Sequence, residues 1–145
     1  MWICKSRGQG SQGWIDSVSQ TTSLVSLTLS YRTMGTITEG VEFDTIAREW
    51  RCKWSDDSDK KSLAEAQKLL TSVIDDLKKV DGVKGVQRIV CGGCKDFKVI
   101  TSLSADKFEG WSKDEFPPEK DFLEKLEAID GISTVETQTY TIMPM

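Results

Sequence analysis

The chain repeats one pattern at an interval of 49 residues. The segment 77–86 reads LKKVDGVKGV, and the segment 126–135 reads LEAIDGISTV. The correspondence extends upstream to a pair of strand-like stretches, in which Trp50, Cys52 and Trp54 match Val99, Thr101 and Leu103. A strand–helix–strand unit is therefore written twice, and this duplication restricts the possible folds more than any other feature.

The first unit begins with a strand at 43–54, where apolar and polar side chains alternate. The segment 62–65 has the form of a capping box, S-x-x-E, and predicts the start of a helix. Apolar residues then recur at three- and four-residue steps up to Val80, which indicates one apolar stripe on that helix. Asp81 and Gly82 end it, because glycine tolerates the left-handed conformation that often follows a helix.

The rest of the chain divides in a similar way into strands, a turn, a polar connection and a second helix: strand 83–90, turn 91–96, strand 97–103, connection 104–115, helix 117–130 and strand 134–143. Pro117 and Pro118 favour the start of the second helix, since a missing amide donor costs nothing in a first turn. Asp130 and Gly131 repeat the stop signal of the first helix.

The order of elements predicts a ferredoxin-like βαββαβ sandwich of the α+β class. Such a fold has a four-stranded antiparallel sheet with both helices on one face. We expect the other face to carry apolar groups from several strands, and an uncovered apolar area of that size indicates an interface. The sequence therefore predicts a homodimer that packs sheet against sheet.

Residues 1–33 differ from the remainder because they are rich in Ser, Thr, Gly and Gln and poor in acidic residues. This leader has three interpretations: an organellar transit peptide, translated sequence upstream of a start at Met34, or a short extra strand at 23–29. A disordered leader is a further alternative. Residues 34–145 are predicted to form a single ferredoxin-like domain. The expected location is the cytoplasm, or a plastid or mitochondrion if the leader is a transit peptide.

Histidine is absent from the sequence, so serine–histidine and cysteine–histidine pairs and histidine metal sites are excluded. Any acid–base chemistry would need a carboxylate, lysine or thiol with a shifted pKa. The net charge of −4 argues against unaided binding to nucleic acid. No apolar run approaches the length that crosses a bilayer. Neither a nucleic-acid partner nor a membrane is expected, and no cofactor is predicted.

Two segments resemble parts of the Lrp/AsnC-type ligand-binding domain. Segment 86–99 is similar to its strand, Gly-containing turn, Asp and following apolar strand, and 131–139 is similar to its C-terminal strand, where Gly-Val precedes Glu-Thr. The resemblance covers about residues 43–145 and implies the dimeric α/β-barrel superfamily, which includes stress-responsive barrel and antibiotic-monooxygenase-like families. It implies dimerisation through the sheets and effector binding near Gly92, Gly93 and Asp96.

Two departures from that family limit what the resemblance implies. Residues 1–33 are too short and lack the helical periodicity for a winged helix-turn-helix, so a DNA-binding regulator is not expected. Catalytic members of the barrel group commonly rely on a histidine, which this chain lacks.

The motif Cys91-Gly92-Gly93-Cys94 has three interpretations. A redox pair needs a lowered thiol pKa, usually supplied by a helix N-terminus, whereas this motif leads into a strand. A zinc site would take Cys91 and Cys94 as two of four ligands, so both are candidate metal ligands only in combination with others. The simplest interpretation is a Gly-Gly hairpin turn between two small residues.

Aromatic and charged residues supply the remaining candidates. Trp50 and Trp54 share one face of the first strand and would line a ligand pocket or pack in a core or interface. Arg48 on that face needs a partner, and Glu136, Asp96 or an anionic ligand are the alternatives. The predicted ligand-binding set is Arg48, Trp50, Trp54, Gly92, Gly93, Asp96, Glu136 and Tyr140. No catalytic residue is assigned.

The main hypothesis is a non-enzymatic homodimeric domain that binds a small molecule or a partner protein at the sheet face and the 91–96 turn. Three alternatives stay open. One is a cofactor-independent enzyme of the dimeric-barrel group that works without histidine. It would need an enclosed apolar cavity that contains Asp96, Glu136, Tyr140 or Arg48. The others are a thiol redox or metal-binding module and an accessory subunit of a larger complex.

Overall fold

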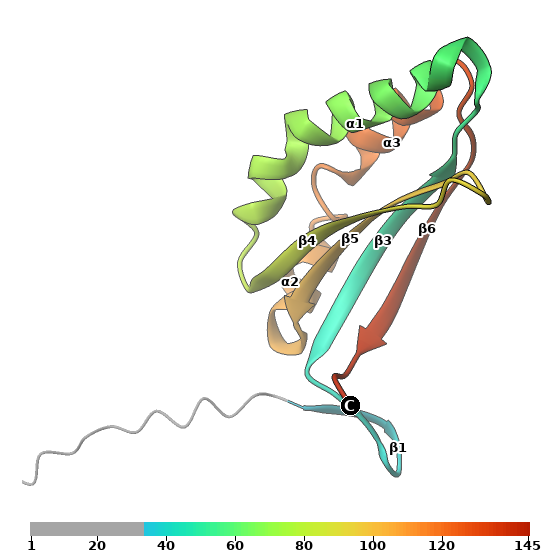
Figure 1. Cartoon of the computed structure of the whole chain (residues 1–145). Helices are drawn as coiled ribbons and strands as arrows, with labels where there is room; N and C mark the ends of the chain where they lie inside the picture. Colours follow the sequence, from blue (N-terminus) through green and yellow to red (C-terminus); the bar gives the residue numbers. More distant parts are fainter. Residues whose placement is uncertain (1–33) are drawn as a thin grey trace, which may run out of the picture. The chain divides into compact units, whose positions relative to one another are not determined.

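Figure 1 shows the computed structural model, which describes residues 34–145. In chain order the elements are β1 (Gly35–Thr38), β2 (Val41–Phe43), β3 (Thr45–Lys53), α1 (Asp57–Lys78), β4 (Val83–Val90), β5 (Asp96–Ser104), α2 (Ala105–Lys113), α3 (Glu119–Glu127) and β6 (Ser133–Ile142). The long strands form one antiparallel sheet in the order β4-β5-β3-β6, and β1 pairs with β2 in a separate hairpin.

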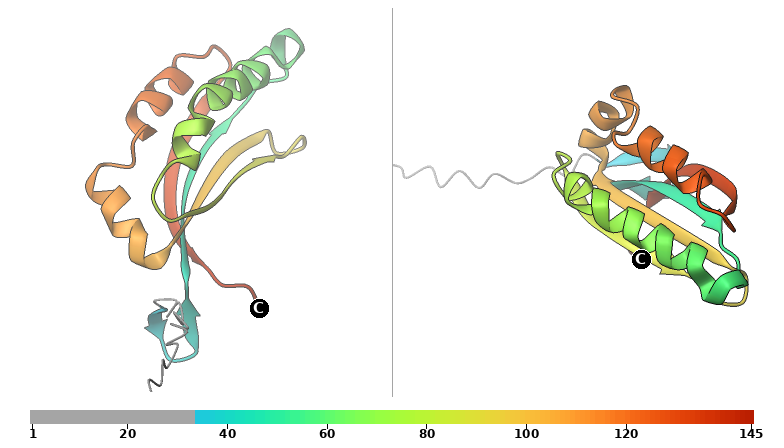
Figure 2. Two further views of the ribbon diagram at one scale, coloured as in Figure 1. Left: turned by 90° about the vertical axis from the view of Figure 1, so that its left-hand side faces the viewer. Right: turned by 90° about the horizontal axis from the view of Figure 1, so that it is seen from above.

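This arrangement confirms the predicted ferredoxin-like α+β fold. Helices α1, α2 and α3 all lie on the same face of the sheet, as the two views in Figure 2 show. Side chains from all three helices join strand residues in one hydrophobic core. The prediction of two helices was incomplete, because α2 occupies most of the segment 104–115 that was expected to be a polar connection.

The sequence repeat has a geometric counterpart at the centre of the sheet. Trp50 and Val99 correspond in the repeat, and they are also direct cross-strand neighbours on β3 and β5. The pairs on either side, Arg48 with Thr101 and Cys52 with Phe97, exchange places when one half is laid on the other. An approximate two-fold axis therefore passes between Trp50 and Val99 and relates β3–α1–β4 to β5–α3–β6.

The core forms where the apolar faces of β3 and β5 meet the helices. Trp50 is 1% exposed and its ring stacks on Phe122 of α3, with ring centroids 4.7 Å apart. The largest fully buried side chains are Trp50, Phe97, Phe122, Leu77, Leu103, Leu126, Val99, Thr101 and Cys52. Each large apolar side chain buried in this way stabilises the fold by about 1.5–3 kcal/mol.

Helix α2 is held to the sheet by an aromatic cluster. Phe108 and Trp111 on α2 and Phe116 after it have ring centroids 5.2–6.2 Å apart. The indole Nε1 of Trp111 donates to the carbonyl oxygen of Pro117 at 3.0 Å. Packing of these aromatic residues stabilises α2, whose mostly polar sequence would not form a stable helix by itself.

The predicted capping box does not start the first helix. Helix α1 begins at Asp57, and the buried hydroxyl of Ser62 accepts a hydrogen bond from the backbone amide of Ser55 at 3.0 Å. Residues 58–60 have positive φ angles, so the regular right-handed turns follow them. Ser62 therefore ties the loop after β3 to the helix and does not cap its first turn.

Both Asp-Gly stop signals are confirmed. Gly82 and Gly131 have φ angles of +81° and +86°, a region that disfavours side chains with a Cβ. At Gly82 a Cβ atom would also lie 2.4 Å from Cβ of Lys107 on α2. This glycine therefore allows α1, β4 and α2 to meet closely. The expected strand at 23–29 lies outside the described residues, and the division at Met34 stays a prediction.

Candidate functional site

The structure distributes the predicted ligand-binding residues over three places. Arg48, Trp50 and Trp54 lie on the face of the sheet that the helices cover. Asp96, Glu136 and Tyr140 point to the opposite, open face, because strand residues alternate and these lie beside Lys53, Arg51 and Ala47 of β3. Gly92 and Gly93 are exposed in the turn between β4 and β5. The set therefore does not form one site.

Arg48 binds Glu119 of α3, so neither predicted partner, Glu136 or Asp96, is correct. The guanidinium donates from Nε and Nη2 to the two carboxylate oxygens, at 2.7 Å each. Trp50 Nε1 donates to the same carboxylate at 2.6 Å. Sequence reasoning missed Glu119 because the contact depends on how α3 crosses the sheet.

The surroundings of Arg48 use nearly all of its donors. Nη1 donates to Thr139 at 3.0 Å and Nη2 to Thr137 at 2.9 Å, and the guanidinium lies over the Phe116 ring at 4.3 Å from its centroid. The Arg48 and Glu119 side chains are only 15% and 13% exposed. A bidentate pair with this much support fixes α3 on the sheet and leaves little capacity for a ligand.

Trp54 is also part of the core and is 5% exposed. The ammonium group of Lys95 lies 4.7 Å from the Trp54 ring centroid, and the backbone amide of Trp54 donates to the Lys95 carbonyl oxygen at 3.0 Å. Within residues 34–145 its indole Nε1 has no acceptor. Trp54 thus connects the end of β3 to the turn between β4 and β5.

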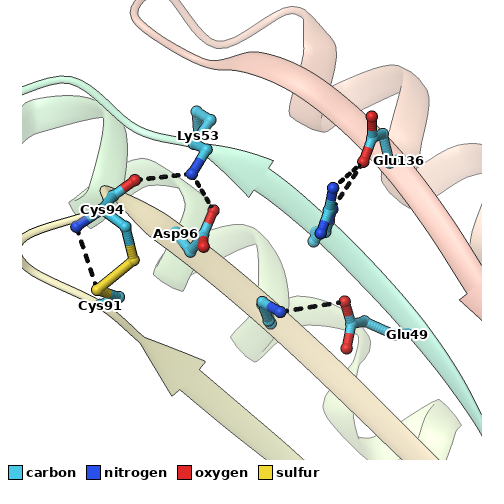
Figure 3. A network of polar contacts seen from close by, with 8 residues as sticks. Glu49, Lys53, Cys91, Cys94, Asp96 and Glu136 are labelled. Carbon is cyan, nitrogen blue, oxygen red and sulfur yellow. Dashed lines mark hydrogen bonds and ion pairs between the residues drawn. A yellow bond between two sulfur atoms is a disulfide. The ribbon is translucent and has the colours of Figure 1, made fainter.

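The open face is charged where an apolar surface was expected. Lys53 pairs with Asp96 at 2.6 Å, Lys98 with Glu49 at 3.5 Å, and Arg51 with Glu136 (Figure 3). Lys53 and Asp96 are directly opposite on adjacent strands, as are Arg51 and Glu136. The expectation failed because the second face of β3 presents Thr45, Ala47, Glu49, Arg51 and Lys53, of which three are charged.

Glu49 is the most deeply buried charge on the open face, with 4% of the residue exposed. Tyr140 donates its hydroxyl to Glu49 Oε2 at 3.0 Å, while Oε1 accepts no hydrogen bond from any described residue. Burial and the hydrogen bond to Glu49 raise the pKa of Tyr140 to about 12. The hydrogen bond from Lys53 lowers the pKa of Asp96 below its usual range. Asp96 and Glu136 each pair with a cation of β3, Lys53 and Arg51 respectively.

The cysteine motif forms a disulfide-bonded turn. Cys91 and Cys94 are joined, and their Cα atoms lie 5.6 Å apart. The turn also closes through the Cys91 amide, which donates to the Asp96 carbonyl oxygen at 2.9 Å. No group of three His, Cys, Asp or Glu side chains suited to a metal ion occurs in the part of the chain that the structure describes.

A hollow of about 410 Å³ lies between α1 and the β4 edge of the sheet, and we name it the α1–β4 groove. Its lining comprises Asp59, Lys60, Leu63, Ala64, Gln67, Arg88, Val90 and Phe97. The size and the mostly apolar walls with a few polar groups are typical of small-molecule sites. None of the predicted site residues lines it, because the groove forms only when α1 packs beside β4.

Arg88 is the charged group of the α1–β4 groove that matters most for binding. Its guanidinium donates to the side-chain oxygen of Gln67 on α1, so it spans the groove from β4. Among the ion pairs between described residues, none involves Arg88. Its guanidinium therefore forms no ion pair with a described carboxylate and can bind an anionic ligand.

A second hollow, of about 510 Å³, lies between the end of α1 and α2. Its lining includes Asp81, Asp106 and Asp114, and the ion pair of Lys107 with Asp81 at 2.9 Å lies within it. The carboxylates of this hollow would repel an anionic ligand.

No helix within residues 34–145 is long and apolar enough to span a membrane.

Three solved structures with this fold are similar to the chain. A monooxygenase, ActVA-Orf6 from Streptomyces coelicolor in complex with nanaomycin D, is 10% identical, with a TM-score of 0.54 over 71% of this chain and 90% of that one. A variant of SnoaB, a cofactor-independent oxygenase from Streptomyces nogalater, is 14% identical, with a TM-score of 0.52 over 70% and 96%.

The third, described as a candidate antibiotic biosynthesis monooxygenase from Deinococcus radiodurans, is 10% identical, with a TM-score of 0.52 over 69% and 94%. No protein-family model matches the sequence, and no curated protein matches it. At these identities the structural likeness shows the fold alone, a ferredoxin-like α+β sandwich that the chain shares with the three proteins.

These similarities correct the hypothesis of a non-enzymatic binding domain. The three proteins described above are named as oxygenases, one of them as a candidate, and SnoaB is named as a cofactor-independent one. These names agree with the alternative of a cofactor-independent enzyme of the dimeric-barrel group. None of the three is an Lrp/AsnC protein, so that narrower resemblance stays a prediction.

Proposed function

We propose that this chain is an enzyme of the dimeric α/β-barrel type that oxidises a planar hydroxyaromatic substrate with O₂ and without a bound cofactor. The α1–β4 groove, with its apolar walls and the guanidinium of Arg88, carries the proposal. The likeness to a cofactor-independent oxygenase and to a monooxygenase solved with nanaomycin D supports the choice of reaction and of substrate class.

The proposed reaction uses no cofactor, so the substrate itself must supply the electrons that reduce O₂. An aromatic anion supplies electrons more readily than its neutral acid. Arg88 would favour the phenolate form of a hydroxyaromatic ligand, because an opposite charge nearby lowers the pKa of an acid. Asp59, the carboxylate among the lining residues, would accept the proton.

An anthrone is a suitable probe, because its ring CH₂ group becomes a carbonyl in the anthraquinone product. One oxygen atom of O₂ enters the ring, the other leaves as water, and the substrate supplies all four electrons. The reaction can be followed by the absorbance of the anthraquinone and by O₂ uptake. We expect turnover of a dihydroxyanthrone well above the protein-free rate.

Two variants test the assigned roles. Arg88→Met should raise KM by about tenfold through the loss of a charge-assisted contact, and Asp59→Asn should lower kcat. The matched control is Lys68→Met, at an exposed position of α1, the helix that carries Asp59. It should leave both KM and kcat unchanged. Oxidation no faster than the protein-free rate, or equal activity of Arg88→Met and the wild type, would refute the proposal.

We also propose that the chain forms a homodimer through the open face of the sheet. A second copy that packs on this face would meet charged groups such as Lys53, Asp96, Arg51 and Glu136. Because salt screens charges at such an interface, we expect sedimentation velocity to show a dimer that weakens as ionic strength rises. A strict monomer at micromolar concentration in low salt would refute it.

A further inference from the structure

The disulfide-bonded turn between β4 and β5 has features that the enzyme proposal does not use. Cys94 is exposed and Cys91 half-buried, with the exposed Gly92 and Gly93 between them. Figure 3 shows the turn next to the ion pair of Lys53 and Asp96 on the open face. One sulfur of the disulfide is therefore open to a reacting partner, whereas the other is partly shielded.

A backbone hydrogen bond distinguishes the two sulfurs further. The amide of Cys94 donates to Cys91 Sγ at 3.1 Å. A hydrogen bond to the charged form of a group favours that form, so this amide would stabilise a thiolate at Cys91. In thiol–disulfide exchange the sulfur that leaves more easily is the one whose thiolate is better stabilised. The geometry thus favours attack at Cys94 and departure of Cys91.

The sequence pattern alone argued against redox chemistry, because the motif does not begin a helix. In the structure the amide of Cys94 supplies the kind of stabilisation that helix amides supply elsewhere. The objection based on sequence therefore does not hold for this turn.

The turn is also connected to the core. Lys53 Nζ donates to the Cys94 carbonyl oxygen at 2.8 Å, and the Trp54 amide donates to the Lys95 carbonyl oxygen at 3.0 Å. The Lys95 ammonium group lies over the Trp54 ring. Opening the disulfide removes the covalent restraint on Cys94, so the contacts that Lys95 makes with Trp54 should change.

We propose that Cys91–Cys94 is a thiol–disulfide exchange site for a dithiol protein of the thioredoxin class. A thiolate of the reductant attacks Cys94 Sγ, the Cys91–Cys94 bond breaks, and Cys91 leaves as a thiolate that takes up a proton. The second thiol of the reductant then attacks the mixed disulfide and releases Cys94. Two electrons and two protons pass to the chain, and the reductant becomes a disulfide.

The test uses the full chain and follows one peptide. Trypsin cleaves after Arg88 and Lys95, so both cysteines lie in the single peptide 89–95, IVCGGCK. Alkylation before and after reduction, followed by mass spectrometry, gives the oxidised fraction directly. We expect thioredoxin to reduce the Cys91–Cys94 disulfide of the full chain about 100-fold faster than dithiothreitol at equal concentration. The reason is that the attacking thiol of a specific partner has a pKa near ambient pH. Equal rates would overturn the proposal.

A trapping experiment tests which sulfur is attacked. Thioredoxin that lacks its second cysteine should remain attached as a mixed disulfide, and fragment spectra should place it on Cys94. Attachment mainly to Cys91 would contradict the geometry described above.

Tryptophan fluorescence tests the connection to Trp54. Reduction should shift the emission of the wild type but not of the double variant Cys91→Ser, Cys94→Ser. Cys52→Ser is the control and should behave as the wild type, because burial raises the pKa of the Cys52 thiol to about 12 and keeps it unreactive. Identical spectra of oxidised and reduced wild type would show that the turn exchanges without affecting Trp54, which overturns this part.

Discussion

The two faces of the sheet carry charge in different ways. On the covered face, Arg48 and Glu119 form one enclosed bidentate pair to which Trp50 adds a third hydrogen bond. On the open face, Arg51, Lys53 and Lys98 make single ion pairs with Glu136, Asp96 and Glu49, mostly in contact with solvent. The same residue types therefore contribute differently, because the helices remove water from one face only.

The largest expected effect comes from breaking the covered pair. Glu119→Ala leaves the guanidinium of Arg48 buried without a carboxylate, and we expect a loss of about 3 kcal/mol in the free energy of unfolding. Chemical denaturation measures it, with Glu124→Ala at an exposed position of the same helix as the control. A loss no larger than that of the control would mean that α3 does not depend on this pair.

A smaller loss of stability is expected from breaking the hydrogen bond between Tyr140 and the buried Glu49. Tyr140→Phe removes the hydroxyl that donates to Glu49 Oε2 and leaves this carboxylate with Lys98 at 3.5 Å as its partner. Loss of a hydrogen bond to a charged group predicts a decrease of about 1.5 kcal/mol in the free energy of unfolding. An unchanged midpoint of denaturation would indicate that Glu49 is hydrated in solution.

The pH dependence of the same residue provides a second measurement. The pKa of Tyr140 is raised to about 12 from an ordinary value of 10.0, so its contribution to stability is complete below about pH 10 and is lost as pH rises towards 12. The chain has two tyrosines, so absorbance of the tyrosinate should show a high-pH step that Tyr140→Phe removes. A step near pH 10 for both residues would contradict the contact with Glu49.

The smallest effect is expected at the exposed ion pair. Glu136→Gln removes the partner of Arg51, but these side chains are 46% and 32% exposed, so water and salt already screen their attraction. We expect thermal unfolding of the dissociated monomer, at low protein concentration in high salt, to show no shift beyond experimental error. A shift comparable to that of Tyr140→Phe under these conditions would show that this pair is not screened as its exposure indicates.

The sequence predicted the parts of the fold that depend on local pattern. The repeat, the alternation in β3 and the two Asp-Gly stops specify the four strands of the main sheet, two of the helices and the ferredoxin-like order. The hairpin of β1 and β2 was not predicted. Helix α2 was missed because its nine residues include Gly110 and only two core aromatics, Phe108 and Trp111, too few for a clear periodicity. Its stability comes from packing on the sheet, which no local pattern contains.

The candidate site was harder to predict. Arg48 was correctly identified as a charge that needs a partner, but Glu119 lies 71 residues away on a helix whose position depends on the finished core. The α1–β4 groove likewise joins Gln67 to Arg88, two polar residues that show no motif. Contacts between elements, rather than residue types, define both features.

The approximate two-fold axis between Trp50 and Val99 also describes how side-chain volume is divided. The symmetry that exchanges the two halves turns the stacked pair of Trp50 and Phe122 into Val99 and Val73. An indole and a phenyl ring thus fill the space beneath α3, whereas two valines take the corresponding positions beneath α1. The backbone is nearly symmetric, but its filling is not, and the α1–β4 groove lies on the side with the smaller side chains. A duplicated scaffold can thus diverge through unequal side chains on equal halves.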